Sequence, residues 1–425
     1  MSAAAERPKV LVALPRFPSA LETGSSILIY NNLVELSKKY DLHVLCHGVA
    51  QSGGDLATFC QRVEFLSQQR SWLPKPLRAP VYGLMGVPRP VYKLRSARMR
   101  RRIAELIAHE EFDALLLYDL RAVQYCPSSC ARWAIACIED PQSLRLHRMS
   151  ALPIWTAWQR FMMRRAARQM ERYEGKVLPP LARVVLLSEA DARDMRQRGG
   201  HENLGVASYA IARVPLDDAG REPRSEGMIV FSGNMYHPAN VDGALWFLDE
   251  MLPLVLEQYP TATLWIVGAR PDPRIATAAR RFAERVVITG RVNDVSEHVR
   301  RARVSICPVR LEIGVQTKVV EALSWGTPVV TTSAGNRGVA ASSGEELWVE
   351  DEPAAFASRV VALLRSQGWN RLSQAGRRLA AERFSQERSA SELERHIEHV
   401  RRIRGKPQHT SGPVSDRAAS PVSGN

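Results

Sequence analysis

The sequence has no long hydrophobic segment and no hydrophobic leader at its start. Charged residues interrupt each apolar stretch well before the ~20 residues that a membrane-spanning helix needs. The first ten residues, MSAAAERPKV, lack the apolar core of a signal peptide. Both absences predict a soluble chain in the cytoplasm.

Cysteine is scarce, and its spacing does not match the usual metal sites. Cys126 and Cys130 form one CxxxC pair without the second pair that a zinc site would need. We therefore expect free thiols, buried or half-buried. The six cysteines are Cys46, Cys60, Cys126, Cys130, Cys137 and Cys307.

Acidic residues are too few to balance the basic ones. The chain has 58 Lys and Arg against 44 Asp and Glu, a formal net charge of +14. This excess predicts an anionic partner, which would be a phosphate-rich ligand, an acidic membrane surface or nucleic acid. Charge alone does not choose among them, but no known nucleic-acid motif accompanies it, so we expect no nucleic-acid partner.

The order of patterns along the chain predicts an α/β protein with two domains. Short apolar runs such as KVLVALP and DLHVLCHG are typical of parallel strands buried on both faces, and stretches with helical spacing separate them. A chain of 425 residues also exceeds what one core usually organises. Ligands of such sheets bind beyond the carboxyl ends of the strands.

A segment rich in proline, glycine and charge separates the two halves, and the alternation then starts again. In the second half, TPVVTTSAG is expected to be the last strand, and the final residues have almost no large apolar side chains. The predicted parts are a first domain (1–212), a linker (213–227), a second domain (228–386), a C-terminal helix (387–404) and a disordered tail (405–425).

The stretch GVQTKVVEALSWGTPVVTT, residues 314–332, carries the most specific chemistry. Its helical part places Lys318 and Glu321 on one face, close to a helix start that follows a glycine. Free backbone N–H groups and a lysine at a helix start suit a diphosphate, and a carboxylate one turn further could accept hydrogen bonds from a ribose diol. The same pair could also be an ordinary surface salt bridge worth ~0.3 kcal/mol.

This stretch resembles the signature of the glycosyltransferase family 4 enzymes. Further motifs agree in order over the second half: FSGNM (231–235), WIVGARP (265–271), ITGRVND (288–294) and ICPVR (306–310). In the first half, PRFPSALETGSSILIYNNLVELS and YEGKVLPPLARVVLLSEADA are similar to bacterial sugar transferases associated with exopolysaccharide and exosortase systems. The resemblance implies a GT-B architecture: two Rossmann-like domains whose parallel sheets face each other across a cleft.

The resemblance also implies roles for individual residues. Glu321 would bind the nucleotide ribose and Lys318 the diphosphate, and these two are the predicted catalytic residues. The turn at Gly314 would present backbone amides to the phosphates or the sugar. The other implied donor-binding residues are Val315, Gln316 and Thr317 for phosphate or sugar, Gly290, Arg291 and Val292 for the base, and the loop glycines Gly24 and Gly233. Each glycine is equally well explained as a turn former.

Two departures from the family pattern concern the donor site. The family commonly has two glutamates separated by seven residues, whereas the first position here is Ile313 and Glu312 comes one place too early. Many members also place an arginine and a lysine after the SG turn, where this chain has NMYHPANVDG. Lys318 would then carry more of the phosphate charge, helped by Arg16 or Arg270.

The resemblance implies a retaining hexosyltransferase that moves a sugar from a nucleotide-diphosphate donor to a hydroxyl of a lipid-linked or polysaccharide acceptor, in exopolysaccharide or cell-envelope glycan synthesis. Asp140, at the end of WAIACIED, is a candidate polar group of the cleft. No DxD pair follows a strand at the expected place, so we expect neither a metal nor a cofactor. The alternatives are a nucleotide-sugar epimerase of the same fold and a membrane-attached scaffold without catalysis.

Two basic segments of the first half favour contact with an anionic membrane. Residues 89–102 hold seven basic residues and no acid. Residues 155–172 form a predicted helix with Trp155, Trp158 and Met162 on one side and arginines at steps of four. The alternative is a solvated helix face above core aromatics. If the first interpretation holds, the protein lies peripherally on the inner face of the cell membrane.

Overall fold

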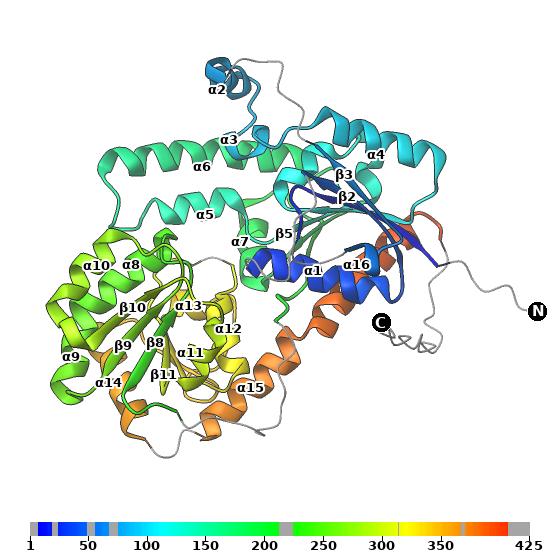
Figure 1. Cartoon of the computed structure of the whole chain (residues 1–425). Helices are drawn as coiled ribbons and strands as arrows, with labels where there is room; N and C mark the ends of the chain where they lie inside the picture. The colour runs from blue at the N-terminus through cyan, green and yellow to red at the C-terminus, as the bar shows by residue number, and fades with distance from the viewer. Residues whose placement is uncertain are drawn as a thin grey trace, which may run out of the picture.

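Two parallel sheets, each covered by helices, organise the computed structural model of the chain (Figure 1). The structure describes residues 7–18, 24–48, 56–67, 75–211, 224–312, 314–366 and 370–406. Most of the predicted linker and of the predicted tail, and also Ile313, lie outside these residues. The predicted fold class, α/β with two Rossmann-like sheets, is confirmed.

The first sheet has seven parallel strands in the order β3-β2-β1-β4-β5-β6-β7. Its central strands are buried on both faces, as the continuous apolar runs predict: Val10 to Leu14 are fully buried, and Val10 pairs with Leu42 on one side and Ala114 on the other. The strands are β1 (Lys9–Leu14), β2 (Asp41–His47), β3 (Arg62–Leu66), β4 (Ala114–Tyr118), β5 (Ala134–Ile138), β6 (Arg183–Leu186) and β7 (Leu204–Val206).

Helices cover both faces of this sheet (Figure 1). Several of these helices begin at a residue whose side chain caps the helix. Ser188, for example, caps α7 by accepting a hydrogen bond from the Asp191 N–H. These helices are α1 (Gly24–Ser37), α2 (Lys75–Leu84), α3 (Arg89–Tyr92), α4 (Ala97–His109), α5 (Gln142–Met149), α6 (Ala157–Val177) and α7 (Glu189–Arg198).

Helix α6 starts two residues later than the sequence predicts. Thr156 and Gln159 form a reciprocal capping box, which fixes the first helical residue at Ala157. Trp155 therefore precedes the helix, and its indole N–H donates to the Met149 carbonyl at 3.0 Å. The predicted stripe of three apolar residues loses Trp155, which is half-buried instead.

The second sheet has the order β10-β9-β8-β11-β12-β13. The prediction that TPVVTTSAG is the last strand is wrong, because β13 pairs beyond β12 at the sheet edge. The strands are β8 (Met228–Ser232), β9 (Thr263–Val267), β10 (Val286–Gly290), β11 (Val304–Cys307), β12 (Val329–Thr331) and β13 (Trp348–Val349). The α-helices of this part are α8 (Pro238–Trp246), α9 (Leu252–Gln258), α10 (Pro273–Ala279), α11 (Val295–Arg301), α12 (Thr317–Ser324), α13 (Ser333–Asn336), α14 (Pro353–Arg365) and α15 (Asn370–Phe384).

The last helix, α16 (Gln386–Ile403), returns to the first sheet and lies beside α1 (Figure 1). Arg401 is buried there and pairs with Asp113 at 3.0 Å. Tyr40 donates to Glu398 at 2.9 Å, and Ser389 contacts Asn32 at 3.0 Å. Because α15 packs on α12 while α16 packs on the first sheet, the C-terminal helices connect the two domains.

Candidate active site

A cavity between the two domains lies at the carboxyl ends of their strands. It has a volume of about 270 Å³ and is lined from both sides. The first domain and the segment that follows its sheet contribute Leu28, Glu139, Asp140, Arg145, Leu187 and Tyr209; the second contributes His237, Ala239, Asn240, Leu311, Gly314, Val315, Gln316, Thr317 and Lys318. We call it the interdomain cavity.

A second cavity of about 370 Å³ belongs to the first domain alone. Glu139, Asp140 and Arg145 line both cavities, so the two adjoin each other at these residues. Asp119, Arg121 and Gln142 add further polar groups to its wall. We call it the first-domain cavity.

The loop before α12 forms one wall of the interdomain cavity. Gly314 has φ 62°, a left-handed conformation that glycine adopts without strain. Gln316 at the N-cap makes no side-chain capping bond, so it leaves the first turn of α12 uncapped by its own side chain. Val315, Gln316 and Thr317 thus line the cavity, and Thr317 is the first residue of α12.

Lys318 lies in the same cavity and is held by neutral partners. Its Nζ donates to Asn240 Oδ1 at 2.9 Å and to Gln316 Oε1 at 3.2 Å. Gly233 (φ 142°) lies directly beneath it, because an added Cβ there would be 3.1 Å from Lys318 Cε and 2.9 Å from Asn240 Nδ2. The glycine turn after β8 therefore leaves room for the lysine.

Glu321 is half-buried one turn further along α12. Burial raises its pKa to about 7, and the positive charge of Lys318 opposes that rise. Burial and then the charges of Glu321 and Glu139 raise the pKa of Tyr209, which lines the cavity. Lys318 and Glu321 thus lie at or near the gap between the domains, and not on the outer surface.

Two other cavity groups have a shifted pKa. Burial, followed by the charges of Lys318 and Arg145, lowers the pKa of His237 to about 4, so this imidazole is neutral at pH 7. Burial also raises the pKa of Asp140, while Arg145 opposes the rise. The cavity therefore combines two permanent cations with carboxyl groups and a neutral histidine.

The remaining predicted residues lie outside the wall of the interdomain cavity. Gly290 has φ 67° at the end of β10, with Arg291 exposed and Val292 packed on the core. Gly24 is the first residue of α1. Arg16 lines the first-domain cavity, and Arg270 (φ 52°) lies 5.6 Å from the ring of Tyr236.

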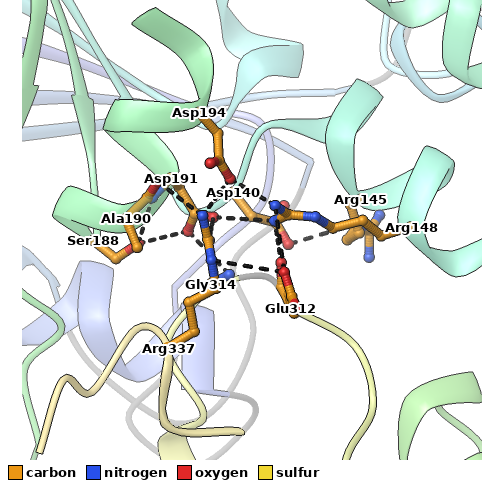
Figure 2. Close-up of polar contacts among 10 residues, drawn as sticks. All are labelled: Asp140, Arg145, Arg148, Ser188, Ala190, Asp191, Asp194, Glu312, Gly314 and Arg337. Atoms are coloured by element: carbon orange, nitrogen blue, oxygen red, sulfur yellow. Dashed lines mark hydrogen bonds and ion pairs between the residues drawn. The ribbon is translucent and has the colours of Figure 1, made fainter. Parts of the chain in front are cut away.

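An interdomain polar cluster, which sequence reasoning missed, holds the loop before α12 (Figure 2). Asp191 of α7 is fully buried and accepts a hydrogen bond from the Gly314 N–H at 3.0 Å. Ser188 donates to the same carboxylate at 2.7 Å, and Arg337 of the second domain donates to its other oxygen at 3.1 Å. The loop before α12 is therefore fixed to the first domain.

Arginines from both domains complete this cluster (Figure 2). Arg337 also pairs with Asp194 and donates to the Ala190 carbonyl at 3.1 Å. Arg148 of α5 pairs with Asp194 at 2.7 Å and donates to the Glu312 carbonyl. The carboxylate of Glu312 lies 3.9 Å from both guanidinium groups, so it faces the cluster, and it is not among the residues that line the cavity.

Among the residues that the structure describes, no group of three or more His, Cys, Asp or Glu side chains is arranged to hold a metal ion. Within the same part of the chain, none of the helices combines the length and the apolar character that crossing a membrane demands.

A family model and a curated relative match parts of this chain. The model of the family Glycosyl transferases group 1 matches residues 226–366. A curated relative, an uncharacterized 44.6 kDa protein in the cps region of Klebsiella pneumoniae, is 24% identical over 139 residues. That match covers 31% of this chain and 36% of the relative.

Solved structures show the same fold over nearly the whole chain. Sucrose-phosphate synthase from Thermosynechococcus elongatus has a TM-score of 0.66 and 13% identity, and the match covers 94% of this chain and 100% of that one. A mutant of TarM from S. aureus, solved with UDP, fondaparinux and α-GlcNAc-glycerol, has a TM-score of 0.64 and 9% identity, and the match covers 92% of this chain and 99% of that one. HepE of Anabaena, solved with UDP and glucose, has a TM-score of 0.58, 14% identity and coverage of 91% and 98%.

Proposed function

We propose that this chain is a retaining glycosyltransferase, because the model of the family Glycosyl transferases group 1 matches residues 226–366 and the chain has a GT-B fold. The proposed reaction moves a sugar from a nucleotide-diphosphate donor to a hydroxyl of a lipid-linked or polysaccharide acceptor. One observation carries the proposal: Lys318 and the glycine loop at the start of α12 line a cavity between the two domains.

The proposed donor binds with its diphosphate at the start of α12. Backbone N–H groups of a first helical turn and the positive end of the helix dipole favour an anion, and the Lys318 ammonium adds a full charge. Glu321 accepts hydrogen bonds from the ribose diol when it is ionised. UDP is the first nucleotide to test, because TarM and HepE were both solved with it.

The proposed acceptor enters from the first-domain cavity. Its wall mixes carboxyl and guanidinium groups, which suits a ligand with many hydroxyls. The shared residues Glu139, Asp140 and Arg145 lie where donor and acceptor would meet. A role in exopolysaccharide or envelope glycan synthesis is supported by the relative from a cps region.

In the proposed mechanism the protein mainly positions the substrates and stabilises charge. As the glycosidic bond breaks, negative charge grows on the diphosphate, and fixed donors aimed at it lower the barrier. The leaving phosphate oxygen takes the proton of the acceptor hydroxyl on the same face of the sugar, so the configuration is retained. Lys318 holds that phosphate throughout.

A peripheral position on an anionic membrane is part of the proposal. Helix α6 exposes Trp158, Phe161 and Met162, and the first two rings stack at 5.7 Å. Arginines on the same helix add positive charge beside this apolar face, and each basic residue near an anionic surface contributes ~1 kcal/mol. Such a surface would bring the protein to a lipid-linked acceptor.

A thermal-shift screen with UDP, GDP and ADP and their sugars tests the proposal first. We expect one nucleotide series to raise Tm, and calorimetry then gives its Kd. Transfer of labelled sugar to a glycan or lipid-linked acceptor would establish the reaction, and the anomeric configuration of the product would establish retention. A chain that binds no nucleotide diphosphate would instead be a scaffold, and isomerisation of the sugar without acceptor would indicate an epimerase.

A further inference from the structure

The second domain supplies little positive charge for a diphosphate. Among its described residues that line the interdomain cavity, Lys318 is the only permanent cation. The turn after β8, where arginine and lysine would be expected, presents Asn234, Tyr236 and His237 instead, and the low pKa of His237 keeps its ring neutral. One ammonium leaves much of the charge of a diphosphate uncompensated.

Arg145 of α5 lies on the opposite wall of the same cavity. Its Nη2 donates to Gln142 Oε1 at 2.6 Å, and Gln142 in turn donates to Asp140 Oδ1 at 2.6 Å. The Nε of Arg145 is 3.7 Å from Asp140 Oδ2, an ion-pair distance that is too long for a hydrogen bond. That nitrogen is buried and has no hydrogen-bond partner among the described residues.

The neighbours of Arg145 hold its side chain and still leave donors free. A guanidinium has five N–H donors in a planar fork that fits phosphate oxygens, and here one is used by Gln142. Arg145 and Lys318 both act electrostatically on His237, which lines the cavity with them. The two cations therefore approach one region of the cavity from different domains.

We propose that Arg145 contacts the diphosphate of the donor from the first domain, opposite Lys318. This inference rests on the proposed function and deepens it: the phosphate site is divided between the domains and is complete only when they are held together. Arg145 would then stabilise the charge that develops on the leaving phosphate. Arg145 would then supply the positive charge toward the diphosphate that we expected from Arg16 or Arg270.

Calorimetry on the full chain tests this with Arg145→Gln and Arg145→Lys, titrated with the nucleoside diphosphate that the wild type binds and with the matching monophosphate. We expect Arg145→Gln to weaken diphosphate binding about tenfold and to reduce the preference for diphosphate over monophosphate. Arg145→Lys should retain part of that preference. Arg132→Ala, at an exposed arginine of the same domain, is the matched control, and unchanged Tm values show that the variants are folded.

The outcomes separate this inference from the proposed function. If the wild type binds no nucleoside diphosphate, the proposed function fails and the inference with it. If the wild type binds one and Arg145→Gln binds it equally well, the inference alone is overturned. A variant with unchanged diphosphate affinity but a raised KM for a lipid diphosphate acceptor would assign Arg145 to an acceptor phosphate and would also overturn it.

Discussion

The backbone N–H of Gly314 lies 3.0 Å from Oδ2 of Asp191, which belongs to the other domain. This N–H is already bonded, so Gly314 positions the loop, and the proposed phosphate contacts would come from the amides that follow it. The carbonyl of Gly314 is confined too, because a Cβ at Gly338 would be 2.0 Å from its oxygen. Arg337, the neighbour of Gly338, bonds the other oxygen of Asp191. One buried carboxylate thus holds both the loop before α12 and Arg337.

Asp191→Asn should therefore loosen the loop before α12. The amide keeps the size and an acceptor for the Gly314 N–H, but it loses the charge that faces Arg337. We expect unfolding to become easier by about 1–3 kcal/mol and sugar transfer to fall about tenfold. Urea unfolding and steady-state kinetics measure the two effects.

Two further variants make this test specific. Glu189→Gln, at an exposed carboxylate on the same helix, should change neither quantity. Arg337→Met should resemble Asp191→Asn, and the double variant should cost less than the sum of the single ones, because the residues share one interaction. Additive effects would show that the contact does not couple the domains.

Replacing the lysine of α12 should reduce affinity for the donor and leave the fold intact. Lys318→Met keeps most of the apolar stem but removes the ammonium that lies between Asn240 and Gln316. We expect the Kd for the nucleoside diphosphate to rise about tenfold or more, with a smaller change for the nucleoside alone. Lys176→Met, at an exposed position of α6, is the control. Equal Kd values for the wild type and Lys318→Met would rule out a phosphate contact.

The sequence predicts the parts of this site that follow a local pattern. Continuous apolar runs identify the buried parallel strands, and the glycine before a helical stripe identifies the loop at α12. Strand β3 escapes because its residues RVEFL include charges, and β13 because it has two residues. These strands lie at the sheet edges, where the pattern is weakest.

The cluster at Asp191 could not be predicted for a different reason. Its partners Arg148 and Arg337 are far from Asp191 in the chain, so no local pattern links the three residues. Only the docking of the domains selects these arginines. Arg145 is similar, since nothing local distinguishes it from Arg148 one turn later on α5.

Binding of the ribose should depend on pH through Glu321, whose pKa is about 7 in the folded chain. Only the ionised form accepts hydrogen bonds from both diol hydroxyls, so affinity for the nucleoside diphosphate should increase as pH rises through 7. Glu321→Gln should weaken binding about tenfold and flatten this dependence. A 2′,3′-dideoxy nucleotide should bind the wild type and the variant alike. A dependence that persists in Glu321→Gln would assign it to another group.

The same carboxyl group should also affect stability. Its pKa is raised from 4.5, so between about pH 4.5 and 7 the folded state binds more protons than the unfolded state, and stability falls as pH rises. Glu321→Gln should therefore reduce the loss of unfolding free energy over this range, by about 1–3 kcal/mol. Glu174, with a pKa also raised to about 7 by burial, contributes in the same direction, so Glu174→Gln is the comparison. An identical pH profile in Glu321→Gln would mean that the carboxyl group titrates normally.

The exposed face of α6 provides the last prediction, which concerns membranes. Trp158 is 69% exposed and Phe161 54%, so replacing both by serine removes apolar area without opening the core. We expect the wild type to sediment with vesicles containing anionic lipid and the double variant to bind several-fold more weakly, since inserted aromatic rings and attraction of the arginines act together. Raised salt should weaken the wild type further, because it screens only the charges. If the wild type and the double variant bind anionic vesicles equally well, or if the wild type binds neutral vesicles as well as anionic ones, this face does not contact an anionic membrane. A lipid-linked acceptor would then have to reach the cleft by another route.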